Sequence, residues 1–204
     1  MRDIGLISRF FSRYIFYVLK SDLVVSWRLI VVLYFLTIPF VNAQQIGSIR
    51  DEFPEFNLTD LNGRSIQKSD MEGKVVVIDF WATWCAPCIK SFPAMIRAEK
   101  NFEENKNVLF IFVNTLEFSG RDEVFIKEFL EKKGIDIDVY LDRPLSKGIS
   151  LSDKLSITTL PQKMIVDFSG NIRYRDKGFS GSDEELISEL TTKINSLLAG
   201  KSDL

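Results

Sequence analysis

The first candidates for chemistry are the two cysteines of the chain, Cys85 and Cys88, which lie in the stretch DFWATWCAPCIKSFPAM. Two cysteines placed at random in a chain of this length would show this spacing roughly 1% of the time. A structural disulfide usually closes a longer loop, because a short loop removes little entropy from the unfolded chain. A structural zinc site needs about four ligands, which two cysteines alone do not supply. The spacing therefore favours a redox-active pair, with a structural pair and a soft-metal clip as alternatives.

The sequence contains no histidine, and this absence excludes several classes of site. It excludes Ser-His-Asp and Cys-His catalysis, and it excludes metals bound through histidine. Proton transfer near neutral pH must then use a Cys, Asp, Glu, Lys or Tyr with a shifted pKa. The formal net charge is −2, so no basic field suggests nucleic acid as a partner. We expect neither a metal nor a cofactor.

A basic segment followed by an apolar one begins the chain. Residues 1–28 carry five Lys or Arg against two Asp, and Leu29–Val41 carries no charge. With Val41 and Ala43 two apart at its end, the segment is typical of a secretory signal peptide that is cut after Ala43. An uncleaved membrane anchor is the alternative, although the apolar run is shorter than the 18 or more residues of most membrane spans. Export would place the cysteines in the periplasm or cell envelope, where disulfides form and persist.

The elements that would position the cysteines follow this segment. We expect three parts: a signal peptide or membrane anchor at 1–43, a linker at 44–52 and one folded domain at 53–200. The run Val75–Phe80, which is rich in β-branched residues, predicts a strand that is buried on both faces. The pattern turns helical from Pro87 to Phe102, so Cys85 would lie between the end of a strand and the start of a helix.

Strands and helices alternate through the rest of the domain. Asn62-Gly63 predicts a hairpin near its start. The other predicted elements are strands at 107–113 and 138–142, a helix at 120–133 that ends before Gly134, a short helix at 150–155, strands at 163–167 and 171–175, and a helix from Ser182 to about Leu198. In the 120–133 helix, the residues expected to face inward are Val124, Phe125, Phe129 and Leu130. This order predicts a single α/β domain.

The predicted helix start would give the two cysteines different roles. A Cys85 thiolate there would meet unpaired backbone N–H groups and the positive end of the helix dipole. Both stabilise the anion, so we expect the pKa of Cys85 to lie below that of a free thiol. Cys88, one turn into the helix, would be shielded, which makes Cys85 the nucleophile and Cys88 the resolving thiol. Pro87 suits the first turn, and Trp84 either covers the site or packs in the core.

The stretch DFWATWCAPC resembles thioredoxin in its strand, its tryptophan and its redox pair, with Ala86 in place of the usual glycine. Pro93 falls where thioredoxins have a helix-kinking proline. The resemblance covers about Phe53 to Leu198. The segment between Val113 and Pro161 is longer than in thioredoxin. With the export signal and the N-terminal hairpin, this makes the chain similar to the exported TlpA/ResA-type branch. The resemblance implies a thioredoxin-like fold: a central mixed β-sheet flanked by helices, with an N-terminal β-hairpin and a central insertion.

The resemblance also implies a docking edge for substrates. Pro161, in TTLPQ, matches the cis-proline that lies opposite the redox pair in the family. The backbone of Leu160 would then pair with a substrate chain, and the proline ring would keep metals from closing on both sulfurs. The expected substrate-binding residues are Trp84, Ala86, Pro87, Leu160 and Pro161.

Asp79 matches the buried acid beneath the redox pair of classical thioredoxin. Buried under Cys88, its pKa should rise, so that it accepts the proton of the resolving thiol. The alternative is an Asp with satisfied hydrogen bonds on an edge strand. At two positions the chain differs from the family pattern in residues that would take part in this proton transfer. Ser91 stands where many relatives of the branch carry a glutamate, and an apolar residue near Phe112 replaces the lysine that neighbours the acid in thioredoxin.

The residues between the cysteines bear on the direction of electron flow. A His there makes a strong oxidant, whereas Ala86-Pro87 carries no charge. We therefore predict a reducing pair, a disulfide reductase that acts on protein thiols and disulfides and is recharged by an electron donor in the membrane. The family suggests apocytochrome c or misoxidised exported proteins as clients.

Two other functions are open on this fold. A thiol peroxidase needs a Thr or Ser three residues before its cysteine and a Pro seven before it, but those positions are Ala82 and Ile78. A non-catalytic redox or copper-handling module is the other alternative. Copper-delivery relatives use a wider cysteine spacing together with a histidine, and this chain has no histidine.

Overall fold

The computed structural model describes residues 51–143 and 148–200. The predicted signal peptide or anchor at 1–43, and most of the predicted linker, lie outside the described residues. Within the described ranges, no helix is both long enough and apolar enough to cross a bilayer.

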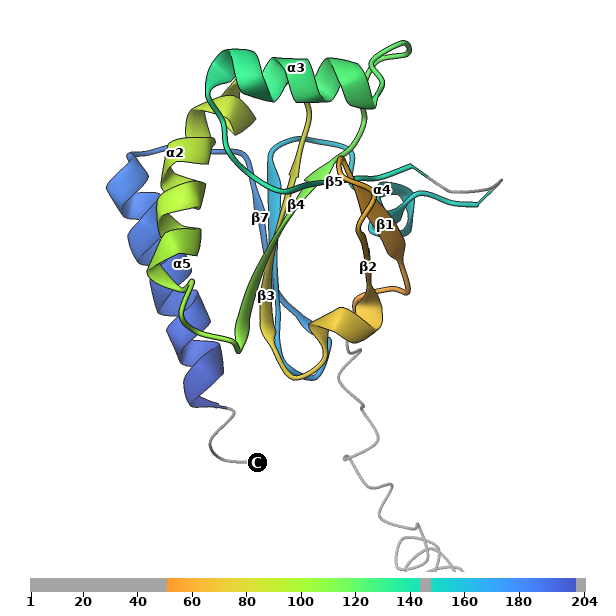
Figure 1. Ribbon diagram of the computed structural model, residues 1–204. Helices are drawn as coiled ribbons and strands as arrows, with labels where there is room; N and C mark the ends of the chain where they lie inside the picture. The colour runs from red at the N-terminus through yellow and green to blue at the C-terminus, as the bar shows by residue number, and fades with distance from the viewer. Residues whose placement is uncertain (1–50, 144–147, 201–204) are drawn as a thin grey trace, which may run out of the picture. The chain divides into compact units, whose positions relative to one another are not determined.

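A seven-stranded mixed sheet forms the centre of the folded part, in the order β2-β1-β5-β4-β3-β6-β7 (Figure 1). Its strands are β1 Asn57–Asp60, β2 Ser65–Gln67, β3 Val75–Trp81, β4 Val108–Asn114, β5 Val139–Leu141, β6 Gln162–Val166 and β7 Ile172–Lys177. β3, β4 and β5 run parallel to one another, and the remaining pairs are antiparallel. The mixed sheet, the N-terminal hairpin β1–β2 and the flanking helices confirm the predicted fold.

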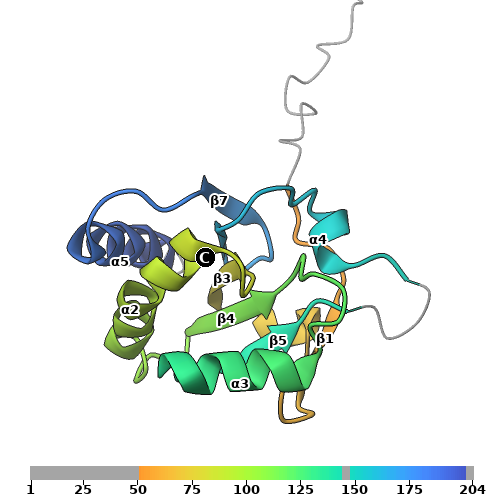
Figure 2. The ribbon, with the colours of Figure 1, turned by 90° about the horizontal axis from the view of Figure 1, so that it is seen from above.

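Helices cover both faces of this sheet (Figures 1 and 2). They are the 3₁₀ helix η2 Lys68–Met71 and the α-helices α2 Ala86–Asn101, α3 Glu123–Lys133, α4 Leu151–Lys154 and α5 Asp183–Ala199. α2, α3 and α5 pack on one face and share a core with β3. α4, η2 and the segment before β1 cover the other face with a second core.

β3 explains how the domain places its redox pair. All seven of its residues are buried, because the strand is central and both faces are covered. Side chains alternate between the two faces of the sheet. Val76, Ile78 and Phe80 point into the core on the α4 side, and Val77 and Trp81 point into the core on the α2 side. Asp79 belongs by this alternation to the α2 face, which is the face that carries the cysteines.

The helix α3 differs from the prediction in the face that it buries. It begins after Asp122, whose side chain accepts the backbone N–H of Phe125, and it ends at Gly134 with a left-handed φ of 63°. Ile126 and Leu130 are its buried residues. The expectation that Val124 and Phe125 face inward was therefore wrong, since they are 62% and 39% exposed. Ile126 lies one turn before Leu130 on the same stripe, and the other two do not.

Candidate active site

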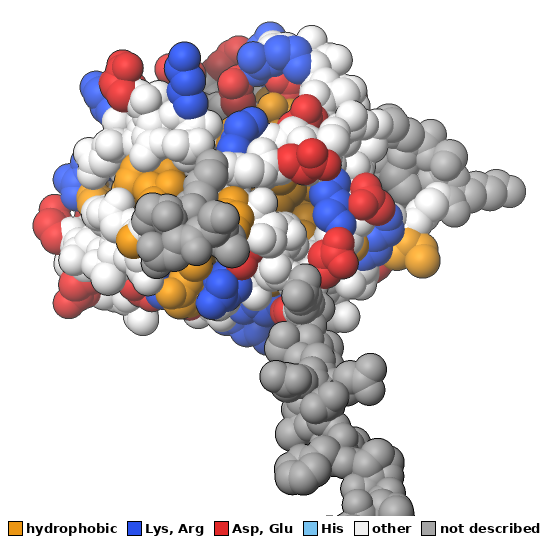
Figure 3. Space-filling model, turned by 90° about the horizontal axis from the view of Figure 1, so that it is seen from below, with side chains coloured by type: hydrophobic (Ala, Val, Ile, Leu, Met, Phe, Trp, Pro, Cys, Tyr) orange, Lys and Arg blue, Asp and Glu red, His pale blue; other side chains and the backbone are white. Residues whose placement is uncertain are grey.

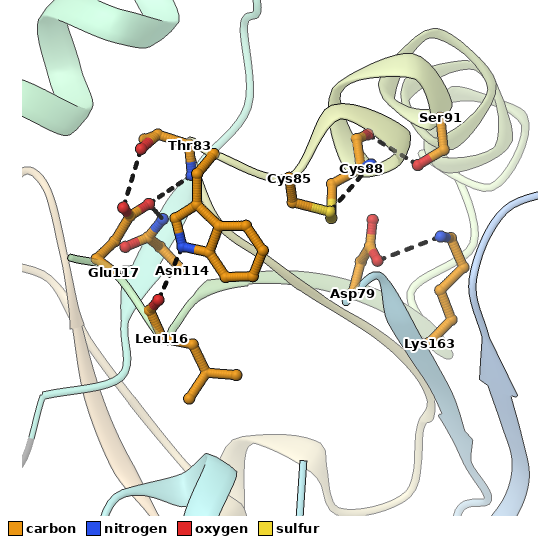
Figure 4. The surroundings of a disulfide bond; sticks show 10 residues. Asp79, Thr83, Cys85, Cys88, Ser91, Asn114, Leu116, Glu117 and Lys163 are labelled. Carbon is orange, nitrogen blue, oxygen red and sulfur yellow. Dashed lines mark hydrogen bonds and ion pairs between the residues drawn. A yellow bond between two sulfur atoms is a disulfide. The ribbon is translucent and has the colours of Figure 1, made fainter. Parts of the chain in front are cut away.

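Cys85 and Cys88 lie at the start of α2 and are joined as a disulfide (Figure 4). Cys85 is the N-cap residue of α2, and the backbone N–H of Cys88 donates to Cys85 Sγ at 3.3 Å. This is the contact that would stabilise a thiolate on Cys85 once the disulfide is reduced. Cys85 keeps 2% of its surface exposed and Cys88 none. Ala86 and Pro87 are exposed beside them.

The Leu160–Pro161 peptide is cis, as the resemblance implies. It leads directly into β6, which pairs antiparallel with β3, the strand that ends before the cysteines. The carbonyl of Pro161 accepts the backbone N–H of Gly178 at 2.8 Å. The backbone N–H and C=O of Leu160 have no partner among the described residues, so this residue has the free groups that a docking edge requires.

Asp79 is fully buried on the central strand β3, which excludes the alternative of an Asp on an edge strand. In Figure 4 its carboxyl group points toward the disulfide. Burial raises the pKa of Asp79, and the nearby charge of Lys163 opposes that rise. The direction of the shift agrees with the prediction, and its main cause is desolvation of the carboxylate.

Lys163 is a residue of the site that sequence reasoning missed. It lies on β6 directly opposite Asp79, and its Nζ is 3.4 Å from Asp79 Oδ1. The expected apolar neighbour is also present, since Phe112 pairs with Asp79 from β4 on the other side. A lysine nevertheless adjoins the acid, because Lys163 comes from the strand after the cis-proline. A lysine within the apolar strand KMIV was the available signal.

Several buried polar atoms on β3 and β6 lack hydrogen bonds. Within the described residues neither carboxylate oxygen of Asp79 has a hydrogen-bond partner, and the same holds for Lys163 Nζ, Gln162 Oε1 and Trp81 Nε1. All four residues lie on β3 or β6. Buried polar groups are nearly always hydrogen-bonded, because an unpaired one costs about 1–3 kcal/mol. Of these residues, Asp79 and Lys163 retain each other as an ion pair at 3.4 Å.

Ser91 takes the position where the family branch often carries a glutamate. It is buried, and its hydroxyl donates to the carbonyl oxygen of Cys88 at 2.9 Å. A serine in this place supplies no second acid. Asp79 remains the buried acid expected to handle protons near Cys88.

Trp84 is exposed by 41%, so it does not serve as a core aromatic. Trp81, three residues earlier, is the tryptophan that fills the core. The indole Nε1 of Trp84 donates to the carbonyl oxygen of Leu116 at 2.8 Å, in the loop between β4 and α3. Trp84 thus lies over the surface beside Cys85 and is held in one orientation.

Glu117, in the same loop, is a second residue that sequence reasoning did not find. Its carboxylate accepts the backbone N–H of Thr83, the Thr83 hydroxyl at 2.9 Å and the amide of Asn114 at 3.0 Å. Arg121 Nη1 donates to the Thr83 hydroxyl at 2.6 Å and lies 3.5 Å from the same carboxylate. This network ties the loop to the residues that precede Cys85 (Figure 4). No local pattern predicts its contact with Thr83, because Thr83 and Glu117 lie 34 positions apart.

The fold and the site define a thioredoxin-like protein with a redox-active Cys-x-x-Cys pair at the start of a helix, opposite a cis-proline. The comparisons then give the family. Residues 49–175, more than half of the chain, match the AhpC/TSA family, and the chain belongs to it.

Curated relatives carry the name thiol-disulfide oxidoreductase ResA. The protein from Bacillus subtilis strain 168 is 32% identical over 119 residues, which are 58% of this chain and 62% of that one. The match therefore spans less than two thirds of that relative. The ResA of Bacillus cereus strain ATCC 10987 is 30% identical over 154 residues, covering 74% of this chain and 84% of the relative.

Solved structures agree on the fold. A Chlorobium tepidum protein assigned to the thiol:disulfide interchange protein DsbE is 25% identical with a TM-score of 0.58, and the match covers 71% of this chain and 95% of that one. StoA from Bacillus subtilis is 23% identical with a TM-score of 0.55, over 69% and 98%. With the redox pair, these neighbours agree with the thioredoxin-like fold of the chain.

Proposed function

We propose that this protein is a thiol–disulfide oxidoreductase that reduces protein disulfides in the cell envelope. The observation that carries the proposal is the position of Cys85. It is the N-cap of α2, it accepts a backbone N–H, and it is the only one of the two cysteines with exposed surface. Those are the conditions under which a thiolate is stabilised and can reach a client disulfide.

The first step is attack on the client. The thiolate of reduced Cys85 attacks one sulfur of the client disulfide, a new Cys85–client S–S bond forms, and the other client sulfur leaves as a thiolate. Leu160 supports this step, because its free N–H and C=O can pair with the extended client backbone beside Pro161. Trp84, Ala86 and Pro87 surround Cys85 on the exposed side and would contact the client.

The second step releases the client. Asp79 accepts the proton of the Cys88 thiol, and the Cys88 thiolate then attacks Cys85 Sγ. The Cys85–Cys88 disulfide forms, and the second client sulfur leaves as a thiolate that takes up a proton. Two electrons have passed from the protein to the client. The raised pKa of Asp79 suits this role, because a carboxyl with an ordinary pKa would be a weak acceptor for a thiol proton.

Turnover requires that the disulfide be reduced again, and we assign this to a thiol donor in the membrane. The neutral residues Ala86 and Pro87 between the cysteines support the reducing direction. The basic and apolar pattern of residues 1–43 supports export, with either cleavage after Ala43 or retention as an anchor.

Insulin reduction by dithiothreitol tests the activity. We expect the wild-type protein to accelerate precipitation of the insulin chains, and the Cys85→Ser and Cys88→Ser variants to lose multiple turnover. A wild-type protein without activity would contradict the proposal and favour a non-catalytic module. If the protein consumes hydrogen peroxide, and the Cys88→Ser variant still carries out the first step of that reaction, a peroxidase would be favoured instead.

Two further measurements test direction and roles. The midpoint potential, measured by equilibration with glutathione or dithiothreitol buffers, should lie near that of thioredoxin, about −270 mV, and far below the −120 mV of strong oxidants. Cys88→Ser expressed in the native host should trap clients as mixed disulfides through Cys85. Trapping through Cys88 in a Cys85→Ser variant, with none through Cys85, would reverse the assignment of the nucleophile.

A further inference from the structure

A buried cation lies next to the proposed proton acceptor. Lys163 is only 2% exposed, although lysine is among the residue types that are least often buried. A buried ammonium group costs free energy unless an anion compensates it. Within the described residues, the anion at ion-pair distance from Lys163 is Asp79, whose Oδ1 lies 3.4 Å from Nζ. The position of Lys163 is therefore matched to that of Asp79.

The sheet fixes where this cation lies. The strand β6 pairs with β3 on one side and with β7 on the other, and all five of its residues are buried. Lys163 is directly opposite Asp79 in the ladder with β3. Residues that are directly opposite each other in an antiparallel pair project from the same face of the sheet. The register of a central strand thus brings the ammonium to the acid.

The groups around Asp79 other than Lys163 give its carboxylate no support. Neither carboxylate oxygen has a hydrogen-bond partner in the part of the chain that the structure describes. The hydroxyl of Ser91 on α2 is used by the carbonyl oxygen of Cys88. Phe112 pairs with Asp79 from β4. The helices α3 and α5 contribute apolar side chains to the core on this face: Ile126, Leu130, Leu190, Ile194 and Leu197.

Two titratable groups at the rim of this core are engaged with each other. Tyr174 of β7 packs against the core, and Nζ of Lys193 from α5 lies 5.0 Å from the centroid of its ring. Lys193 is also paired with Asp176 and Glu189. The pKa of Asp79 accordingly depends on burial, which raises it, and on the charge of Lys163, which opposes the rise.

This arrangement bears on whether Asp79 can act as a base. A carboxyl group must be ionised before it can accept a proton. A carboxyl that is buried without a counter-charge stays protonated at neutral pH, because burial removes the water that stabilises its anion. The ammonium of Lys163 makes the buried pair neutral as a whole. Figure 4 shows the carboxyl of Asp79 directed toward the disulfide while it is joined to Lys163.

We propose that Lys163 is a positioning residue for the resolving step, which keeps Asp79 in the carboxylate form until the Cys88 thiol delivers its proton. The proposal rests on the proposed reductase activity and adds a residue to its second step. The S–H bond of Cys88 breaks, an O–H bond forms on Asp79, and Lys163 keeps its own proton. Asp79 becomes a carboxylate again when this proton passes to the departing client thiolate.

Stopped-flow reduction of 5,5′-dithiobis(2-nitrobenzoic acid) separates the two steps of the reaction. One equivalent is mixed with the reduced full-length protein, and the release of each thionitrobenzoate is followed by its absorbance. The first release reports attack by Cys85, and the second reports attack of Cys88 on the mixed disulfide. Both rates are measured from acidic to alkaline pH.

We expect Lys163→Met to slow the second release about 100-fold at neutral pH, because Asp79 is then protonated and accepts no proton. The midpoint of the pH profile of this release should rise by about one to three pH units, and the first release should keep its rate. Lys163→Arg retains a cation and should keep the wild-type midpoint. Lys193→Met is the matched control and should leave both releases unchanged, since Lys193 is paired at the rim.

A double variant tests whether Lys163 acts through Asp79. We expect Asp79→Asn with Lys163→Met to resolve the mixed disulfide as slowly as Asp79→Asn alone, because the acceptor is already lost. Losses that add up would overturn the proposal. Carbon NMR of the aspartate side chains in the reduced wild type gives a measurement that requires no variant of Lys163. Asp79, assigned by the loss of its signal in Asp79→Asn, should be a carboxylate at neutral pH, and a protonated Asp79 would overturn the proposal.

The outcomes separate the two proposals. Circular dichroism checks that each variant is folded, and Lys163→Gln takes the place of Lys163→Met if that variant does not fold. A folded variant without the cation that keeps the wild-type midpoint would overturn the role of Lys163 and leave the reductase standing. Equal slowing at every pH would overturn it as well, since that result indicates a structural defect. Failure of the wild type to reduce insulin would overturn the reductase, and the second release would still decide whether Lys163 keeps Asp79 ionised.

Discussion

Two carboxyl groups flank the disulfide, and the protein treats them in opposite ways (Figure 4). Asp79, beneath the pair, is fully buried and has no hydrogen bond in the described structure, with only Lys163 at 3.4 Å. Glu117, beside the pair, accepts hydrogen bonds from Thr83 and Asn114. The same functional group has the proposed proton-transfer role on one side, and on the other it fixes the loop to the residues before Cys85.

The difference shows how burial and hydrogen bonding set the charge state of a carboxyl group. A carboxylate with several donors is stable as an anion and fixes the groups around it. A carboxyl that is desolvated, with one ammonium group as its partner, has a raised pKa, which suits exchange of a proton with a thiol. In Figure 3, a view of the domain from below, acidic and basic side chains are interspersed over the surface, with apolar side chains between them.

The largest effect on the free energy of unfolding should come from removing Lys163, the ion-pair partner of the buried Asp79. Lys163→Met leaves Asp79 without its nearby cation, and we expect a loss of about 3–5 kcal/mol in the free energy of unfolding at neutral pH. Chemical denaturation measures it. Lys193→Met is the matched control, because Lys193 pairs with Asp176 and Glu189 nearer the surface. Its loss should be about 1 kcal/mol or less.

The loss in Lys163→Met should also depend on pH, with a definite sign. The pKa of Asp79 is raised in the folded protein, so its ionisation favours the unfolded state once the pH exceeds the unfolded pKa. Without Lys163 the folded pKa rises further. The difference from the wild type should therefore shrink as the pH falls toward that of an ordinary aspartate. A difference that is constant with pH would contradict the pairing.

The next effect concerns rate. Asp79→Asn cannot accept the proton of Cys88, and we expect resolution of a Cys85 mixed disulfide to slow about 100-fold at neutral pH. Rapid-quench measurement of client release would record it. The loss should diminish at alkaline pH, where the Cys88 thiol ionises without help. Equal slowing at every pH would point to a structural defect and argue against Asp79 as the proton acceptor.

A smaller effect should follow on the other side of the disulfide. Glu117→Ala leaves the N–H of Thr83 and the amide of Asn114 without their acceptor, which should cost about 2 kcal/mol of stability. The pH profile of mixed-disulfide resolution should keep its shape. Glu184→Ala, which removes an exposed carboxylate paired with Arg97, should have no measurable effect on stability. If the pH profile of mixed-disulfide resolution shifts in Glu117→Ala, then Glu117 also takes part in proton transfer, and the proposed difference in role between Glu117 and Asp79 is wrong.

The smallest effect on stability should come from replacing the whole buried pair. Asp79→Leu with Lys163→Met exchanges two desolvated charges for apolar side chains of similar size. We expect a free energy of unfolding equal to or above that of the wild type. The double variant should nevertheless resolve mixed disulfides as slowly as Asp79→Asn. Thermal melts test the expected stability, and the client-release assay tests the expected rate. A strongly destabilised double variant would contradict the view that Asp79 and Lys163 are present for proton transfer.

Local patterns predicted the elements well where they depend on neighbours in the chain. Asn62-Gly63 marked the β1–β2 hairpin, and Ser182 with Glu185 forms the capping box at the start of α5. Gly134 ends α3 in the left-handed conformation. The buried faces of α3 were less predictable, because several apolar residues compete and the sheet decides which of them it covers.

The sequence by itself determined the redox centre. The cysteine spacing, the apolar strand before it and the helical pattern after it place Cys85 at a helix start, and these are features of adjacent residues. Asp79 could also be found, because a carboxyl within an apolar strand is conspicuous. The cis-proline required the resemblance to a family.

Only the tertiary structure decided what surrounds that centre. Lys163 meets Asp79 because the antiparallel register of β6 on β3 aligns the two, and Glu117 meets Thr83 because β3 and β4 end side by side. The exposure of Trp84 depends on the loop that binds its indole. These contacts join residues more than 30 positions apart, and their geometry follows from strand register and packing, which periodicity along the chain does not encode.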